Sequence, residues 1–161
     1  MLESEVGQLD GFRHNASVLG ERKPLVQHSV AAWHEVMQVN LTAPFLMTKA
    51  LLPLLEQAEK ASIIFTSSGV GKKGKAYWGA YSVSKFGTKG MAQIWADELA
   101  NTSNIRVNVI NPVATHANML TQALPAKKPG TKPLPQGTHR THPYLTTQES
   151  TATPGQDIAV A

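Results

Sequence analysis

Apolar residues recur with two different periods along most of the chain, and these periods predict its elements. Short apolar runs predict strands at residues 9–14, 61–67 and 105–110. Apolar residues at helical spacing predict helices at about 31–58 and 78–100. Because strands and helices alternate, the pattern favours an α/β fold in which three parallel strands and two main helices form β/α units.

The two predicted helices should cover only one face of the predicted sheet. Right-handed crossovers place successive helices on the same side of a sheet, whereas parallel strands are normally covered on both faces. We therefore expect the other face and one edge of the sheet to be bare, and an exposed apolar face of that kind favours association.

The periodic pattern ends in the C-terminal part of the chain. From Pro125 onward the sequence is rich in proline, threonine and lysine and contains few large apolar residues. Composition of this type favours disordered or extended structure. We expect residues 114–161 to form an irregular, disordered tail.

Composition argues against several classes of function. The chain has no cysteine, so it has no disulfide or thiol chemistry, which suits the cytoplasm. No apolar run approaches the roughly 20 residues of a membrane span. The net charge of +4 comes without a nucleic-acid recognition motif. The histidines lack metal-site spacing, so we expect surface histidines and no metal; they are His14, His28, His34, His116, His139 and His142.

The strongest chemical signal is Tyr81 followed four residues later by Lys85, with Ser68 upstream. Positions i and i+4 of a helix share one face. A neighbouring cation favours the phenolate, so Lys85 is expected to lower the pKa of Tyr81 and tune it as a proton donor and acceptor. Ser68 ends an apolar run, and a hydroxyl at the carboxyl end of a parallel strand faces the ligand crevice of α/β proteins. An exposed tyrosine and a solvated lysine on a helix surface are the alternative interpretation.

Further motifs accompany this pair in a fixed order. They are Asn15-Ala16 after the first predicted strand, Asn40 in the first predicted helix, Ser68, Tyr81 with Lys85, and Pro112. From about Leu9 to Pro112 the sequence resembles the short-chain dehydrogenase/reductase family. Within that family it is most similar to bacterial oxidoreductases of the YciK type.

The resemblance implies a partial Rossmann-type, NAD(P)-binding domain over residues 1–113. It also implies an NAD(P)-dependent oxidoreductase that transfers hydride between nicotinamide and a carbonyl or alcohol substrate. In the implied catalytic tetrad Tyr81 is the general acid and base, and Ser68 holds the substrate oxygen. Lys85 lowers the pKa of the tyrosine and binds the cofactor ribose, and Asn40 supports a water linked to the lysine.

Cofactor contacts are also implied by the resemblance. Asn15 and Ala16 would lie against the cofactor together with Tyr81 and Lys85, and Pro112 would flank the nicotinamide. The sequence departs from the family in two places. No glycine-rich phosphate turn precedes the first predicted strand, and Val113 follows Pro112 where the family has glycine. We therefore expect a chain shortened at its N-terminus, with cofactor binding weakened or lost.

An alternative function follows from the same departures. The chain is then a catalytically inactive fragment that acts at most as an interaction module. Its partner would be a second copy or a full-length relative, docked through the helices at 31–58 and 78–100. The sequence does not distinguish NAD from NADP, and it does not identify the substrate.

One further expectation rests on Pro44, four residues after Asn40. Proline has no N–H, so the carbonyl of Asn40 loses its usual helical partner and the helix should kink there. We expect the freed carbonyl to serve as a water site, and a tolerated kink without function is the alternative.

Overall fold

The computed structural model describes residues 7–112 and the backbone of residues 157–160. Its elements are β1 (Gly11–His14), η1 (Leu25–Gln27), α2 (Val30–Met37), η2 (Gln38–Thr42), α3 (Ala43–Glu56), β2 (Ala61–Thr66), η3 (Gly69–Gly71), α4 (Gly79–Leu99), β3 (Ile105–Pro112) and β4 (Asp157–Val160). The predicted alternation of three strands with two main helical segments is confirmed. None of the described helices is long and apolar enough to cross a bilayer.

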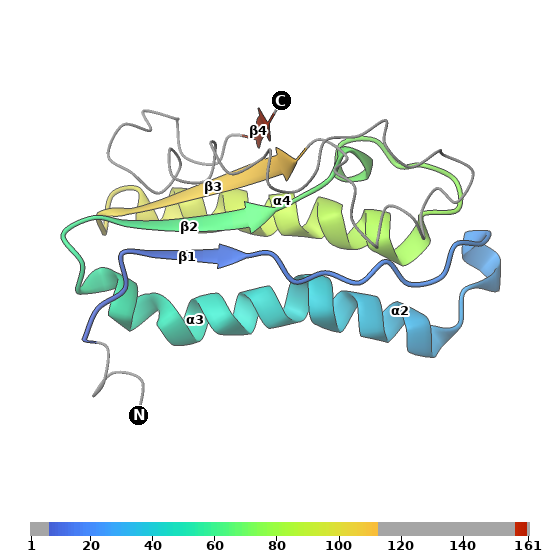
Figure 1. Cartoon of the computed structure of the whole chain (residues 1–161), viewed down its shortest axis with the longest axis horizontal. Helices are drawn as coiled ribbons and strands as arrows, with labels where there is room; N and C mark the ends of the chain where they lie inside the picture. Colours follow the sequence, from blue (N-terminus) through green and yellow to red (C-terminus); the bar gives the residue numbers. More distant parts are fainter. Residues whose placement is uncertain (1–6, 113–156, 161) are drawn as a thin grey trace, which may run out of the picture.

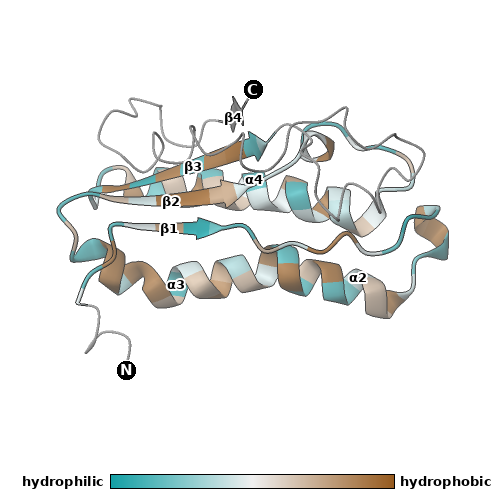
Figure 2. Cartoon of the chain, in the orientation of Figure 1, coloured by the Kyte–Doolittle hydropathy of each residue, from teal (hydrophilic) through white to brown (hydrophobic). Residues whose placement is uncertain are grey.

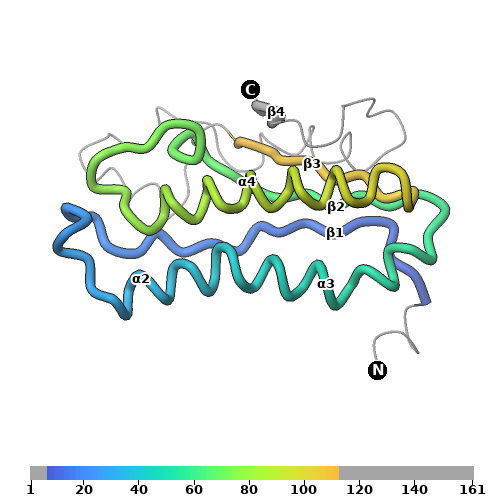
Figure 3. The backbone as a smooth tube through the Cα atoms, turned by 180° about the vertical axis from the view of Figure 1, so that it is seen from behind, coloured from blue at the N-terminus to red at the C-terminus, as the bar shows by residue number. Residues whose placement is uncertain are grey.

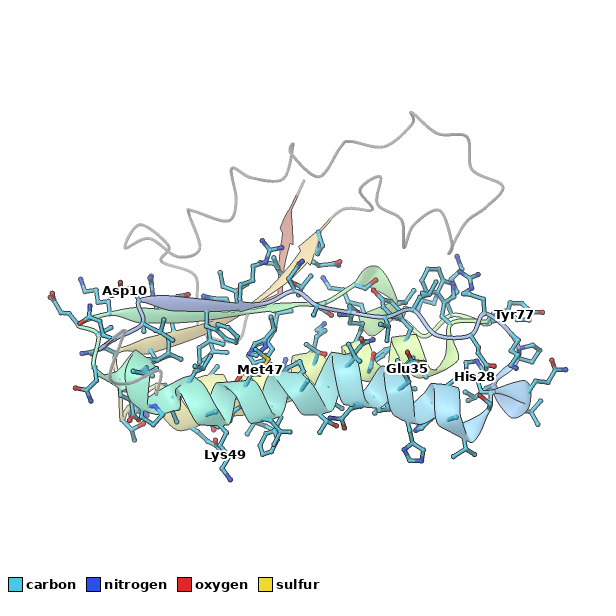
Figure 4. All side chains as sticks on the ribbon, turned by 60° about the horizontal axis from the view of Figure 1, so that its bottom comes forward. Asp10, His28, Glu35, Met47, Lys49 and Tyr77 are labelled. Carbon is cyan, nitrogen blue, oxygen red and sulfur yellow. The ribbon has the colours of Figure 1, made fainter. Side chains whose placement is uncertain are left out.

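The strands form one parallel sheet in the order β1-β2-β3-β4. The continuous helical segment α2–η2–α3 and the helix α4 lie on the same side of β1, β2 and β3 (Figures 1 and 4). This is the arrangement that right-handed crossovers produce. In the view from behind, the two helical segments run side by side along the strands (Figure 3).

The main core lies between the helices and the sheet. It contains alternate residues of β2 and β3 together with inward-facing residues of both helices; they include Leu55, Ile63, Phe65, Ala92, Ala96, Leu99, Val107 and Val109. Figure 2 shows β2 and β3 as largely apolar, whereas the tip of β1 is polar. Burial of each large side chain contributes roughly 1.5–3 kcal/mol to folding.

The expectation of a bare second face is wrong at the centre of the sheet. Residues that alternate with the core residues point to that face; they are Ser62, Ile64, Asn108 and Ile110, and each is at most 1% exposed. Strands buried on both faces are nearly continuous apolar runs, and Ala61–Thr66 is such a run. Among the described strands, β1 has a neighbour on one side only.

The strand β4 was not predicted from the sequence. Its backbone at Asp157–Val160 pairs in parallel with the end of β3, from Val109 to Pro112. Four residues are too few to give a period signal, especially next to a segment rich in proline and threonine. The rest of the predicted irregular tail lies outside the described residues.

The long first helix departs from regular α-helix where the sequence predicts a kink. Residues Gln38–Thr42 form a π-helical turn, in which the N–H of Ala43 donates to the carbonyl of Gln38. Pro44 has no N–H for the carbonyl of Asn40, so the regular α-helical ladder is interrupted there. At the start of α2, the Ser29 hydroxyl accepts a hydrogen bond from the N–H of Ala32 at 3.1 Å.

Candidate active site

Four of the expected residues meet at the carboxyl ends of β1 and β2. Ser68 follows β2, Tyr81 and Lys85 lie in the first turns of α4, and Asn40 lies in the π-turn. The phenol of Tyr81 lies near the Ser68 hydroxyl, which acts to lower the pKa of the phenol. The amide of Asn40 reaches α4 through Ser84, at 3.0 Å.

The Tyr81 side chain is buried, with 8% of its surface exposed. Burial is the largest influence on its pKa and raises it above the ordinary value for tyrosine. The nearby hydroxyls of Ser68 and Ser17 act in the opposite direction and lower the pKa of Tyr81. The phenol is therefore protonated at neutral pH, which makes it a proton donor.

The expected lowering of the Tyr81 pKa by Lys85 is not found. The Lys85 Nζ atom donates to the carbonyl of Thr66 at 2.9 Å and lies 5.6 Å from the centroid of the Tyr81 ring. The lysine is itself only 3% exposed, and burial lowers its pKa to about 8. An ammonium group that is turned toward a carbonyl and easily neutralised does little to stabilise a nearby phenolate.

Asn40 holds the chain after β1 against α4. Its Oδ1 accepts from the N–H of Val18 at 2.8 Å, and its Nδ2 donates to the carbonyl of Val18 at 2.9 Å and to Ser84 Oγ at 3.0 Å. The Ser84 hydroxyl donates in turn to the carbonyl of Tyr81 at 2.7 Å. Asn40 therefore positions both sides of the site, and both donors of its side-chain amide are used.

The carbonyl of Asn40, which the proline deprives of its usual partner, has the Thr88 hydroxyl within reach. The Thr88 hydroxyl lies 3.3 Å from this oxygen but 2.9 Å from the carbonyl of Ser84. One hydroxyl has one proton, and the shorter contact is the better bond. The Thr88 hydroxyl is therefore shared between the two carbonyls, and the use of the Asn40 carbonyl as a water site stays a prediction.

The expected cofactor residues lie at the same edge of the sheet but do not join this network. Asn15 is exposed, and its Oδ1 accepts from Arg13 Nη2 at 2.8 Å and from Thr66 Oγ1 at 3.4 Å. Ala16 is also exposed. Pro112 is the last residue of β3, and no hydrogen bond or ring contact described for residues 7–112 links it to Tyr81.

The glycines after Ser68 do not have equivalent roles. A Cβ atom at Gly71 would lie 2.9 Å from both Lys85 Cβ and Ser67 Oγ, and 3.0 Å from the backbone carbon of Lys85. A Cβ at Gly69 would meet nothing within 4 Å. Gly71 therefore allows the turn η3 to pack directly on α4 beside the lysine.

Aromatic and basic groups border the site, and sequence reasoning missed them. The ring of Trp78 lies 5.8 Å from that of Tyr81, and the Arg22 guanidinium lies 4.2 Å from the Trp78 ring centroid. Figure 4 shows Tyr77 and His28 at this end of the molecule and Asp10 at the opposite end. Tyr77 has a positive φ of 68°, which is uncommon for a residue other than glycine and costs stability.

The expectation of surface histidines is wrong for His14. Its side chain is 8% exposed, stacks on Phe65 with ring centroids 4.6 Å apart, and lies 2.8 Å from Thr48 Oγ1 through Nε2. Burial lowers its pKa to about 4. The residue is a neutral part of the packing beneath the site, because the end of β1 is covered by α3.

The family model of the short chain dehydrogenase matches residues 1–128. The chain belongs to the short-chain dehydrogenase family. Two curated relatives illustrate the similarity. An uncharacterized oxidoreductase, YciK of Escherichia coli K12, is 48% identical over 122 residues, which are 76% of this chain and 48% of that protein. A 3-oxoacyl-(acyl-carrier-protein) reductase of Thermotoga maritima is 36% identical over 121 residues, 75% of this chain and 48% of that protein.

Solved structures of short-chain dehydrogenases share the fold. A putative short chain dehydrogenase from Pseudomonas syringae gives a TM-score of 0.95 at 48% identity, covering 98% of this chain and 64% of that one. A putative short chain dehydrogenase from Escherichia coli CFT073, complexed with NADPH, gives 0.92 at 39% identity, covering 98% of this chain and 65% of that one. The predicted family, its YciK-type branch and the Rossmann-type fold are confirmed. The chain spans about half the length of the curated relatives it matches.

A nicotinamide cofactor is what the family implies, and part of the site fits one. The Lys85 amine has three donors when protonated, of which one is used on the Thr66 carbonyl, so donors are free for ribose hydroxyls. The exposed Asn15 lies at the same edge of the sheet. These groups fit the nicotinamide–ribose half of the cofactor, whereas residues 7–112 contain no glycine-rich turn of the phosphate-binding pattern.

Proposed function

We propose that the chain carries the catalytic centre of an NAD(P)-dependent oxidoreductase acting on a carbonyl or alcohol substrate. The observation that carries the proposal is the buried phenol of Tyr81, which lies near the Ser68 hydroxyl at the carboxyl end of β2. The bound nicotinamide supplies hydride chemistry. Tyr81 exchanges a proton with the substrate oxygen, and Ser68 holds that oxygen in place by a hydrogen bond.

The protonation state favours one direction of reaction. Because burial raises the pKa of Tyr81, the phenol is ready to donate its proton to a carbonyl oxygen, as reduction requires. Alcohol oxidation requires the phenolate, which costs more in this buried site. Lys85 would hold the ribose hydroxyls, and Asn15, Ala16 and Pro112 would border the cofactor.

Cofactor binding tests the proposal directly. Purified protein is titrated with NADPH and with NADH, and quenching of tryptophan fluorescence is recorded; Trp78 lies 5.8 Å from Tyr81 and is the natural reporter. We expect saturable binding that Lys85→Ala abolishes. Lys49→Ala is the matched control, because Lys49 is exposed and points away from the sheet (Figure 4). Solved relatives with NADPH and NADP support the phosphorylated cofactor as the tighter ligand.

A specific observation favours a second candidate, an interaction module. Apolar residues line a groove between the π-turn, α3 and α4; they are Leu41, Phe45, Met91, Ile94 and Trp95, and they border Gly87 and Gly90. Phe45 is 43% exposed and Ile94 is 59% exposed. We propose that a second copy of the chain, or a longer relative, covers this groove.

Light scattering after size-exclusion chromatography tests the second candidate. The parent should be larger than a monomer, and Ile94→Glu should release monomers by placing a charge in the interface. Lys89→Glu is the control, since it introduces the same acid on α4 at a residue that does not line the groove. A monomeric parent at high concentration contradicts this candidate, and a folded chain that binds neither cofactor contradicts the first.

A further inference from the structure

One buried hydroxyl of the site has no role in the tetrad. The Ser17 Oγ atom is shielded from solvent, and no protein atom meets ordinary hydrogen-bond geometry with it. It nevertheless lies close enough to the Tyr81 phenol to interact with it, as Ser68 does. An unpaired buried hydroxyl is costly to keep, so a partner for it in some state of the site is expected.

The position of Ser17 is fixed by its neighbours rather than by a loose loop. Both backbone polar groups of Val18, the next residue, are bonded to the side chain of Asn40. Asn40 is linked through Ser84 to the carbonyl of Tyr81. Leu19 packs on Tyr81 in one small apolar cluster. The segment that carries Ser17 and the turn that carries Tyr81 are therefore held together on both sides.

We propose that Ser17 is a positioning residue for Tyr81. The Ser17 hydroxyl donates a hydrogen bond to the phenol oxygen of Tyr81 once that oxygen has given up its proton. The proposal deepens the proposed function and rests on it for its catalytic meaning. Ser17 and Ser68 then approach the phenol from two segments, one after β1 and one after β2. In this step the phenol O–H bond breaks and an O–H bond forms on the substrate oxygen, while Ser17 keeps its own proton.

The Ser17 hydroxyl should interact differently with the neutral phenol of Tyr81 and with its phenolate. A neutral phenol competes for acceptors and gains little from a second donor, whereas a phenolate accepts hydrogen bonds that are shorter and stronger. The Ser17 hydroxyl therefore stabilises the ionised state more than the neutral one. Its influence on the pKa of Tyr81 has this sign and opposes the larger effect of burial. The other charged groups recorded near the ring are Lys85 and, across Trp78, Arg22.

Ionisation of the phenol provides the test. A fluorinated tyrosine that ionises at lower pH than tyrosine is placed at position 81 by genetic encoding, and its fluorine NMR shift is followed against pH. Ser17→Ala removes the hydroxyl, Ser17→Thr keeps it, and Ser17→Gly removes it without leaving a methyl group. Ser103→Ala is the matched control, because its hydroxyl bonds the carbonyl of Leu99 at the far end of α4.

We expect Ser17→Ala and Ser17→Gly to move the ionisation midpoint to higher pH by about one unit. Ser17→Thr and Ser103→Ala should titrate as the parent does. An unchanged midpoint in folded Ser17→Ala and Ser17→Gly overturns the proposal, as does an equal shift in Ser17→Thr. No cofactor is present in this measurement. A chain that fails to bind NADPH can therefore still support the role of Ser17, and a chain that binds NADPH can still refute it.

Discussion

The layer between the sheet and the helices has two ends of opposite character, and α4 contributes to both. Near its C-terminus α4 contributes Ala92, Ala96 and Leu99 to an apolar core. Near its N-terminus it contributes Tyr81, Ser84, Lys85 and Thr88, which are buried and mostly polar. The first end is stabilised by burial of apolar surface. The second keeps groups that cost stability, namely a buried amine and an unpaired hydroxyl, which is common at sites of function.

The largest effect should come from the apolar end. Leu55 is fully buried there, so Leu55→Ala should lower the free energy of unfolding by about 2–5 kcal/mol through lost burial and a cavity. Urea denaturation measures this loss. Leu46→Ala is the control in the same helix, because Leu46 is 50% exposed. A similar loss in both variants would contradict the assignment of the core.

The next largest effect is a gain in the free energy of unfolding when Lys85 is replaced, and this gain depends on pH. The pKa of Lys85 falls from 10.5 to about 8 on burial. Below pH 8 both folded and unfolded chains hold the proton, and the folded chain bears the cost of a buried ammonium. Between pH 8 and 10.5 only the unfolded chain keeps the proton, so stability rises with pH. Lys85→Met should therefore stabilise the protein by roughly 3 kcal/mol at neutral pH.

Denaturation at neutral and at alkaline pH checks this sign. The advantage of Lys85→Met over the parent should shrink as pH rises through 8 and vanish above 10.5. Lys49→Met, at an exposed position, should show no such trend. If Lys85→Met is less stable than the parent at neutral pH, the buried ammonium is stabilised by more than its one hydrogen bond to the Thr66 carbonyl.

Two glycines of the same turn, Gly69 and Gly71, should respond differently to substitution by alanine. Gly71→Ala should cost about 1–3 kcal/mol, because the new methyl group would collide with the backbone of Lys85. It should also weaken the binding of NADPH by displacing the lysine. Gly69→Ala meets nothing within 4 Å and should leave both thermal stability and binding close to those of the parent. Equal behaviour of the two variants would refute this packing.

The smallest effect compares the same kind of hydrogen bond in the middle of α4 and just after its C-terminus. Thr88 and Thr102 each donate a hydroxyl to the carbonyl four residues earlier, at 2.9 Å. Thr88 is buried whereas the Thr102 bond is exposed. Thr88→Val should cost about 1 kcal/mol, and Thr102→Val should cost less than about 0.5 kcal/mol. Chemical denaturation of both variants distinguishes them, and a larger loss at Thr102 would argue against a buried network at the site.

The sequence predicted what depends on periodicity and missed what depends on burial. Strand runs and helical spacing located β1, β2, β3 and α4 within a few residues, and the spacing of Tyr81 and Lys85 placed them in the same turns of α4. The pKa of Tyr81 was expected to move in the wrong direction, because the degree of burial cannot be inferred from a local pattern. Ser17 was missed because its relevance arises from the backbone of Val18, which carries no residue-type signal.

The π-turn between α2 and α3 has a consequence for the rotational phase of the whole helical segment. In an uninterrupted α-helix, Val36 and Leu55 would lie about 100° apart around the axis. Both are fully buried. The extra residue of the wider turn at Gln38–Thr42 absorbs about one residue of rotation and returns Leu55 to the side occupied by Val36. Deleting one residue there should restore a regular α-helix that still turns Thr48 and Leu55 toward the sheet, whereas forcing the turn into α-helix without a deletion would rotate them about 100° away.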